Sequence, residues 1–137
     1  MFQDLLSNRY TIGIAIPFIL FLTGAFAKKI VRGSAWERRD FFLGIEFALA
    51  AMTSALVYLV ELAKIVDKSE SIKNQLTITG VFIAITFFCL LFVLSTHQDW
   101  EKPNVNTKKQ FWSLCILANL IGSSLLFAFI VLIKGLN

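Results

Sequence analysis

Residues 34–68 read SAWERRDFFLGIEFALAAMTSALVYLVELAKIVDK and decide the fold expected for the chain. The apolar run 41–62 is long enough to cross a bilayer, because a helix of about 20 residues spans the hydrocarbon core. Two acids lie inside this run, Glu46 well within one end and Glu61 close to the other. A carboxylate at membrane depth needs a partner or water. The run therefore predicts a transmembrane helix that does not face lipid on all sides.

Small or polar residues recur along one side of this predicted helix. At 100° per residue, an arc of about 100° contains Glu46, Ala50, Thr53, Ser54, Val57 and Glu61. The same side extends back to Arg39 and forward to Lys64. A continuous side of this kind seldom points at lipid, so we expect it to line a pore or a path for ions or protons.

The overall composition is typical of a membrane protein. Apolar residues make up 57% of the 137 residues and charged residues only 16%, whereas about a quarter of a soluble domain is charged. Trp36, Trp100 and Trp112 lie at the ends of apolar runs, where indole rings prefer the headgroup region. We therefore expect an all-α integral membrane protein of a bacterial-type inner membrane or a plasma membrane.

Four apolar runs predict four transmembrane helices joined by short loops, in a single domain covering residues 1–137. The runs are 10–27, 41–62, 76–96 and 111–133. Ser34 and Glu37 fit a capping box, which predicts that the second helix starts near Ala35. If it runs unbroken to Val66, it is about 48 Å long. The expected fold is a four-transmembrane-helix bundle with a long second helix that projects beyond the hydrocarbon.

The distribution of Lys and Arg predicts the orientation. Eight basic residues lie in the first and third loops: Lys28, Lys29, Arg32, Arg38, Arg39, Lys102, Lys108 and Lys109. Five lie on the other side: Arg9, Lys64, Lys68, Lys73 and Lys134. Because cytoplasmic loops carry the excess of Lys and Arg, this bias favours cytoplasmic first and third loops, with both termini outside.

Three further polar residues are placed to share a layer with Glu46 near the cytoplasmic boundary: Thr23, Asn119 and Ser123. Ala118 and Gly122 form a small-xxx-small pattern, so the fourth span offers a side that can close against the second. Two interpretations remain open. Glu46 and Asn119 can bond to each other and hold the bundle together, or Glu46 can line a wet path or take up a proton.

The first loop is the most basic segment of the chain. Its cationic side chains are Lys28, Lys29, Arg32, Arg38 and Arg39. They fit a signal that keeps this loop in the cytoplasm. They also fit a site for an anionic lipid headgroup or a phosphate-bearing cytosolic ligand, because Arg makes two-pronged contacts with such groups.

Other chemistries are disfavoured by what the sequence contains. His97, Asp99 and Glu101 alternate in the third loop, but without a second His they indicate a solvated turn rather than a metal site. Cys89 and Cys115 lie in apolar runs and form no CxxC pair, which is typical of inert thiols. No Gly-x-Ser motif or paired catalytic Asp lies at a membrane boundary. We expect no metal, no cofactor and no enzymatic activity.

These features favour an oligomeric membrane channel or pore whose second helix lines the path. One four-helix protomer is too small to enclose both a pore and its own packing, so several copies must surround a symmetry axis. A cytosolic trigger at the basic first loop would make the protein a gated effector that depolarises the membrane. Two alternatives remain. One is a non-catalytic membrane subunit or immunity-type protein that binds another membrane protein, and the other is a proton-coupled small-molecule transporter that uses Glu46.

Overall fold

The computed structural model describes residues 8–66 and 69–133 as helices joined by short connections, with no strand in those ranges. The helices, in chain order, are α2 Arg9–Arg32, η1 Arg38–Phe41, α3 Gly44–Ala63, α4 Glu70–Trp100, α5 Thr107–Gln110, η2 Phe111–Ala118, α6 Asn119–Ala128 and η3 Phe129–Ile133. The last four segments adjoin and form one fourth helix, in which η2 and η3 have the wider π-helical turn. Lys68 and Lys134, two of the basic residues counted in predicting the orientation, lie outside the described residues.

The four predicted apolar runs correspond to four helices. Within the described residues, four helical stretches are long and apolar enough to cross a membrane: Arg9–Arg32, Arg38–Ala63, Glu70–Trp100 and Thr107–Ile133. This result confirms the expectation of an all-helical chain with four membrane-length segments.

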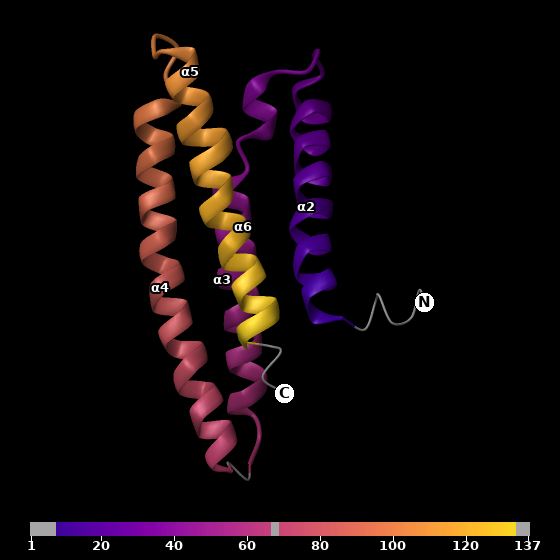
Figure 1. Cartoon of the computed structure of the whole chain (residues 1–137), viewed down its shortest axis with the longest axis vertical. Coiled ribbons are helices and arrows are strands. Elements are labelled where there is room, and N and C mark those ends of the chain that lie inside the picture. The colour runs from indigo at the N-terminus through magenta and orange to yellow at the C-terminus, as the bar shows by residue number, and fades with distance from the viewer. Residues whose placement is uncertain (1–7, 67–68, 134–137) are drawn as a thin grey trace.

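The second span packs against most of the other helices. α3 makes its main contacts with α4 and α6, whereas α2 lies mostly against η1 and the fourth helix. Figure 1 shows the connection before α3 and the connection before α5 at the same end of the bundle. At the other end, α3 and α4 extend beyond the start of α2 (Figure 1). The first and third loops therefore lie together.

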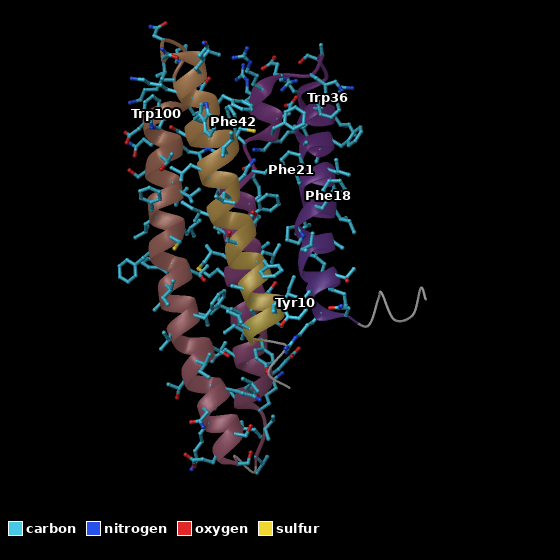
Figure 2. All side chains as sticks on the ribbon, in the orientation of Figure 1. Tyr10, Phe18, Phe21, Trp36, Phe42 and Trp100 are labelled. Atoms are coloured by element: carbon cyan, nitrogen blue, oxygen red, sulfur yellow. The ribbon has the colours of Figure 1, made fainter. Side chains whose placement is uncertain are left out.

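Aromatic contacts attach the first loop to α2. Trp36 and Trp100 both lie near the end of the bundle that carries the first and third loops (Figure 2). The Trp36 ring packs edge-on against Phe26 and stacks on Phe41, with ring centres 5.1 Å and 5.5 Å apart. Lys29 places its Nζ 4.6 Å from the centre of the same ring, within the range of a cation–π contact.

The prediction of a long, unbroken second helix is wrong. The residues before α3 form the short 3₁₀ turn η1, and Phe42 and Leu43 are not helical. α3 begins at Gly44 instead of near Ala35 and has 20 residues. Among the described helices, α4 is the long one, with 31 residues.

The predicted capping box fails because Ser34 has another partner. Gly33 ends α2 in the left-handed conformation, with φ 68°, where Gly is favoured. The Oγ of Ser34 accepts a hydrogen bond from Nε of Arg32 at 2.6 Å. Further on, Asp40 accepts the backbone N–H of Glu37 at 2.9 Å. A local cap therefore forms at η1, and it does not start a long helix.

The third span is also longer than predicted. α4 continues to Trp100, so His97 and Asp99 belong to the helix. His97 is only 6% exposed, and its ring packs edge-on against Phe42 with ring centres 6.5 Å apart. The prediction of a solvated turn is therefore wrong for His97, because Phe42 at the break in the second span covers it.

Small residues let α3 and the fourth helix approach closely. A Cβ built on Gly122 would lie 2.6 Å from the backbone oxygen of Gly44. A Cβ built on Gly44 would lie 2.5 Å from the backbone oxygen of Ala118. The side formed by Ala118 and Gly122 thus closes against the second span, as the small-xxx-small pattern predicts.

Replacing Gly122 with Ala should destabilise the bundle by about 1–3 kcal/mol or more, because the new methyl group meets backbone rather than a flexible side chain. Gly80→Ala is the matched control. Gly80 is exposed within α4, and a Cβ built on it has no heavy atom within 4 Å. Gly80→Ala should therefore raise the free energy of unfolding by about 0.5–1 kcal/mol. Thermal unfolding in detergent, followed by circular dichroism, measures both changes. Equal melting temperatures for the two variants would contradict the close contact.

Candidate functional site: the helix break and the polar side of α3

Asn119 joins the two sides of the break in the second span. Its Oδ1 accepts a hydrogen bond from the backbone N–H of Leu43 at 2.8 Å, and its Nδ2 donates to the backbone carbonyl of Phe41 at 2.7 Å. Asn119 is 8% exposed. An interrupted helix leaves backbone groups without intrahelical partners, which is costly away from water. One side chain of the fourth helix supplies partners for two of them.

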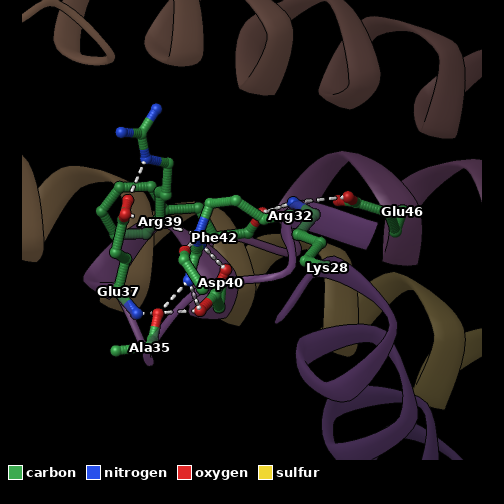
Figure 3. A network of polar contacts seen from close by, with 9 residues as sticks. Lys28, Arg32, Ala35, Glu37, Arg39, Asp40, Phe42 and Glu46 are labelled. Carbon is green, nitrogen blue, oxygen red and sulfur yellow. Dashed lines mark hydrogen bonds and ion pairs between the residues drawn. The ribbon is translucent and has the colours of Figure 1, made fainter. Parts of the chain in front are cut away.

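Lys28 reaches the same break from α2. Its Nζ donates to the backbone carbonyl of Phe42 at 2.6 Å and forms an ion pair with Oε1 of Glu46, also at 2.6 Å (Figure 3). Glu46 lies in the first turn of α3, where the helix dipole favours a negative charge. Its side chain is 46% exposed. The acid singled out in the sequence is therefore stabilised by Lys28 and by the start of its own helix.

A second ionic cluster closes the first loop onto the end of α2. The guanidinium of Arg32 contacts both carboxylate oxygens of Asp40, with 2.9 Å between Nη2 and Oδ2, and its Nε lies 3.3 Å from Oε1 of Glu37 (Figure 3). Asp40 is only 1% exposed and precedes the apolar run 41–62. The hydrogen bonds from Arg32 lower the pKa of the Asp40 carboxyl, against the opposing effect of burial.

The predicted polar side of α3 lies mostly outside the contacts that α3 makes with α4 and α6. Its members are exposed or half-buried: Glu46, Ala50, Thr53, Ser54, Val57 and Glu61. The opposite side supplies the buried residues, among them Phe47, Ala48, Ala51, Ala55, Tyr58 and Leu62. The protomer leaves most of this side exposed, and only Ala50 and Ser54 of the six are half-buried.

Part of this polar side borders a groove between α2, α3 and the fourth helix. The groove has a volume of about 480 Å³ and is lined by Arg9, Ile12, Ile16, Ser54, Leu126, Phe129 and Ile130. Ser54 comes from the polar side of α3, and most of the other lining residues are apolar. Since Lys28 contacts Glu46 near the other end of α2, α2 borders the polar side at two levels.

The predicted polar layer does not form as a set of mutual contacts. Thr23 is exposed, and its Oγ1 donates to the carbonyl of Ile19 in its own helix at 2.9 Å. The Oγ of Ser123 likewise donates to Leu120 at 3.2 Å. Asn119 uses its amide on the backbone of the break, not on Glu46. In place of a shared layer, Asn119 bonds to the backbone of the break and Glu46 pairs with Lys28.

Four of the five basic residues predicted to hold an anion are engaged within the chain: Lys28, Lys29, Arg32 and Arg39. Arg39 forms its ion pair with Glu37, with 2.6 Å between Nε and Oε2. Arg38 is exposed, and in the ranges 8–66 and 69–133 it has no ion-pair partner.

Sequence reasoning missed Lys28 as the partner of Glu46 and Asp40 as the partner of Arg32. A usable signal existed for the first pair. Lys28 is the first charged residue after the apolar run 10–27, and Glu46 lies close to the start of the next run. Adjoining ends of antiparallel spans lie at similar depth, so an acid and a base there can meet.

Neither a metal site nor a similarity to known proteins helps to assign a function to this site. No group of three or more His, Cys, Asp or Glu residues gathers as a metal site in the described part of the chain. Cys89 and Cys115 are half-buried thiols. Comparisons of the chain with protein-family models, with curated proteins and with solved structures find no match.

Asn119→Leu should lower the free energy of unfolding by about 1–3 kcal/mol for each backbone group that loses its partner. Ser123→Ala, one turn further along the same helix, is the control, since its hydroxyl bonds only within that helix. Thermal unfolding of the full chain in detergent compares the two. If both variants have the melting temperature of the wild type, the hydrogen bonds of Asn119 do not stabilise the break.

Asp40→Asn should lower the melting temperature at neutral pH, because it removes the charge that Arg32 binds. The lowered pKa of Asp40 means that this stabilisation is present above the ordinary carboxyl pKa of about 4 and is lost as the pH falls through the lowered value. The difference between wild type and variant should therefore be constant from about pH 5 to 8 and shrink in acid. A difference that grows as the pH falls would contradict the sign of this coupling.

Proposed function

We propose that this protein is a non-enzymatic, oligomeric membrane pore in which the polar side of α3 faces a shared axis. The observation that carries the proposal is the exposure of this side in the protomer. Glu46, Thr53, Val57 and Glu61 are all exposed, although they belong to a helix of membrane length. In lipid, such a side requires water or another polar surface. Copies of the chain arranged around an axis provide both.

The uncovered surface of α3 has two chemically different halves. Leu49, Leu56 and Val60 are also exposed, 42%, 43% and 54% respectively. At 100° per residue they lie beside the polar side and not within it. An apolar half next to a polar half fits a helix that touches lipid or a neighbouring copy with one half and a water-filled path with the other.

Glu61 is the acid that would give such a path its preference for cations, although Lys64 lies on the same side of the helix. Glu61 is exposed near the end of α3, and repetition around an axis would make a ring of carboxylates there. Glu46 would contribute less, because Lys28 neutralises it in each protomer. Lys28 bonds to the helix break next to the first loop, and a ligand that displaced it from Glu46 would change the charge at this end of the path.

Cysteine accessibility in liposomes tests the orientation of α3. In a chain with Cys89 and Cys115 replaced by Ala, Val57→Cys should react with a membrane-impermeant thiol reagent, and Leu56→Cys should not. The two residues are adjacent and similarly exposed in the protomer, 55% and 43%, so only their direction differs. Equal reactivity of the two positions would contradict the proposed path.

Planar-bilayer recording of the same protein tests conduction. We expect cation-selective currents, with Glu61→Gln reducing the preference for cations over anions. Glu70→Gln, an exposed acid at the start of α4, is the control and should leave selectivity unchanged. A monomer in native mass spectra together with no current would overturn the proposal. Such a result would leave the polar side of α3 as a binding surface for another membrane protein.

A further inference from the structure

η1 and the start of the fourth helix form a small pocket that is lined by two cations and no acid. Its volume is about 280 Å³, and its lining residues are Arg38, Thr107, Lys108, Phe111 and Trp112. Arg38 comes from η1, and the other residues begin the fourth helix. The pocket therefore exists only because the fold brings η1 and the start of the fourth helix together.

The cations of this pocket are available to a ligand. Within residues 8–66 and 69–133, neither Arg38 nor Lys108 forms an ion pair, unlike Lys28 and Arg32 of α2 and Arg39 of η1. The start of the fourth helix does not by itself provide the site. The side chain of Asn106 already accepts the backbone N–H groups of Lys108 and Lys109, at 3.0 Å and 3.4 Å.

The size and composition of the pocket indicate a small anion at the membrane boundary. Pockets for drug-sized ligands have volumes of about 300–1,000 Å³, and this one lies just below that range. Guanidinium, ammonium and hydroxyl groups together suit phosphate oxygens. Trp112 is 65% exposed and Phe111 41%, at the beginning of the apolar run 111–133. Exposed aromatic rings in that position are typical of the headgroup region.

We propose that this pocket binds the phosphate of a small anionic group, with Arg38 and Lys108 as its charged contacts and Thr107 as a hydroxyl contact. A lipid headgroup would place its phosphate between the two cations and its acyl chains along the apolar fourth helix, beyond Phe111 and Trp112. The site does not depend on ion conduction, so it stands or falls separately from the pore.

Native mass spectrometry of the full chain in detergent tests this site with equal amounts of phosphatidylglycerol and phosphatidylcholine. We expect preferential retention of phosphatidylglycerol, weakened about tenfold by Arg38→Gln or by Lys108→Gln, since a charged hydrogen bond contributes about a factor of ten. Lys109→Gln removes the same charge from the neighbouring residue, which lies outside the pocket. That control should bind like the wild type. Circular dichroism checks that each variant is folded.

A second arm separates a lipid from free phosphate. Inorganic phosphate should raise the melting temperature of the wild type, but not of Lys108→Gln, if the pocket takes phosphate from water. Phosphatidylglycerol retention without this effect assigns the pocket to a lipid headgroup. The proposal is overturned if neither probe depends on Arg38 and Lys108, or if Lys109→Gln weakens binding as much as Lys108→Gln. Equal loss in those two variants would show a diffuse attraction of the basic loops.

Discussion

The two hydrogen bonds from the Asn119 side chain to the backbone at Phe41 and Leu43 are the interaction on which the rest of the structure depends. A helix interrupted at membrane depth is tolerated only where other groups bond its free backbone atoms. Asn119, on the fourth helix, forms hydrogen bonds with two of these atoms, and Lys28, on α2, donates a hydrogen bond to the Phe42 carbonyl. Three helices are thereby joined at one level, next to the close backbone contact of Gly44 with Ala118.

The break also changes the meaning of the acid in the second span. Because α3 starts at Gly44, Glu46 occupies its first turn and lies 2.6 Å from Lys28. The ion pair with Lys28 accounts for the presence of Glu46 in the second span, and no conduction path is needed to explain it. The remaining polar residues of α3 have no comparable explanation within the described protomer, since Thr53 and Glu61 lie exposed on its uncovered side. Thr53 and Glu61, in the middle and near the end of α3, are therefore stronger candidates for a functional role than Glu46.

Apolar runs and terminal Trp residues were sufficient to predict four membrane-length helices, because burial in hydrocarbon leaves a long, continuous signal in sequence. The break at Phe42 and Leu43 left only a weak signal, because the charged residues 37–40 precede it and Gly44 follows it, but the apolar run 41–62 continues through it. Its bonds to Asn119 cross 76 and 78 residues of chain. Only tertiary packing brings those groups together, so local cap patterns at Ser34 pointed to the wrong helix start. For the polar side of α3, the helical period of 100° per residue predicted that its residues lie on one side of the helix. It could not predict where the other helices pack, and so which of these residues stay exposed.

The most direct test of the account is an experimentally determined structure of the full chain in a lipid bilayer, at a resolution that shows helix orientation and assembly. We predict several copies around an axis, with Thr53, Val57 and Glu61 of each copy facing water on that axis and Leu56 turned away from it. A single copy surrounded by lipid, or an assembly in which the polar side of α3 is packed against a neighbouring helix with no water path, would contradict it.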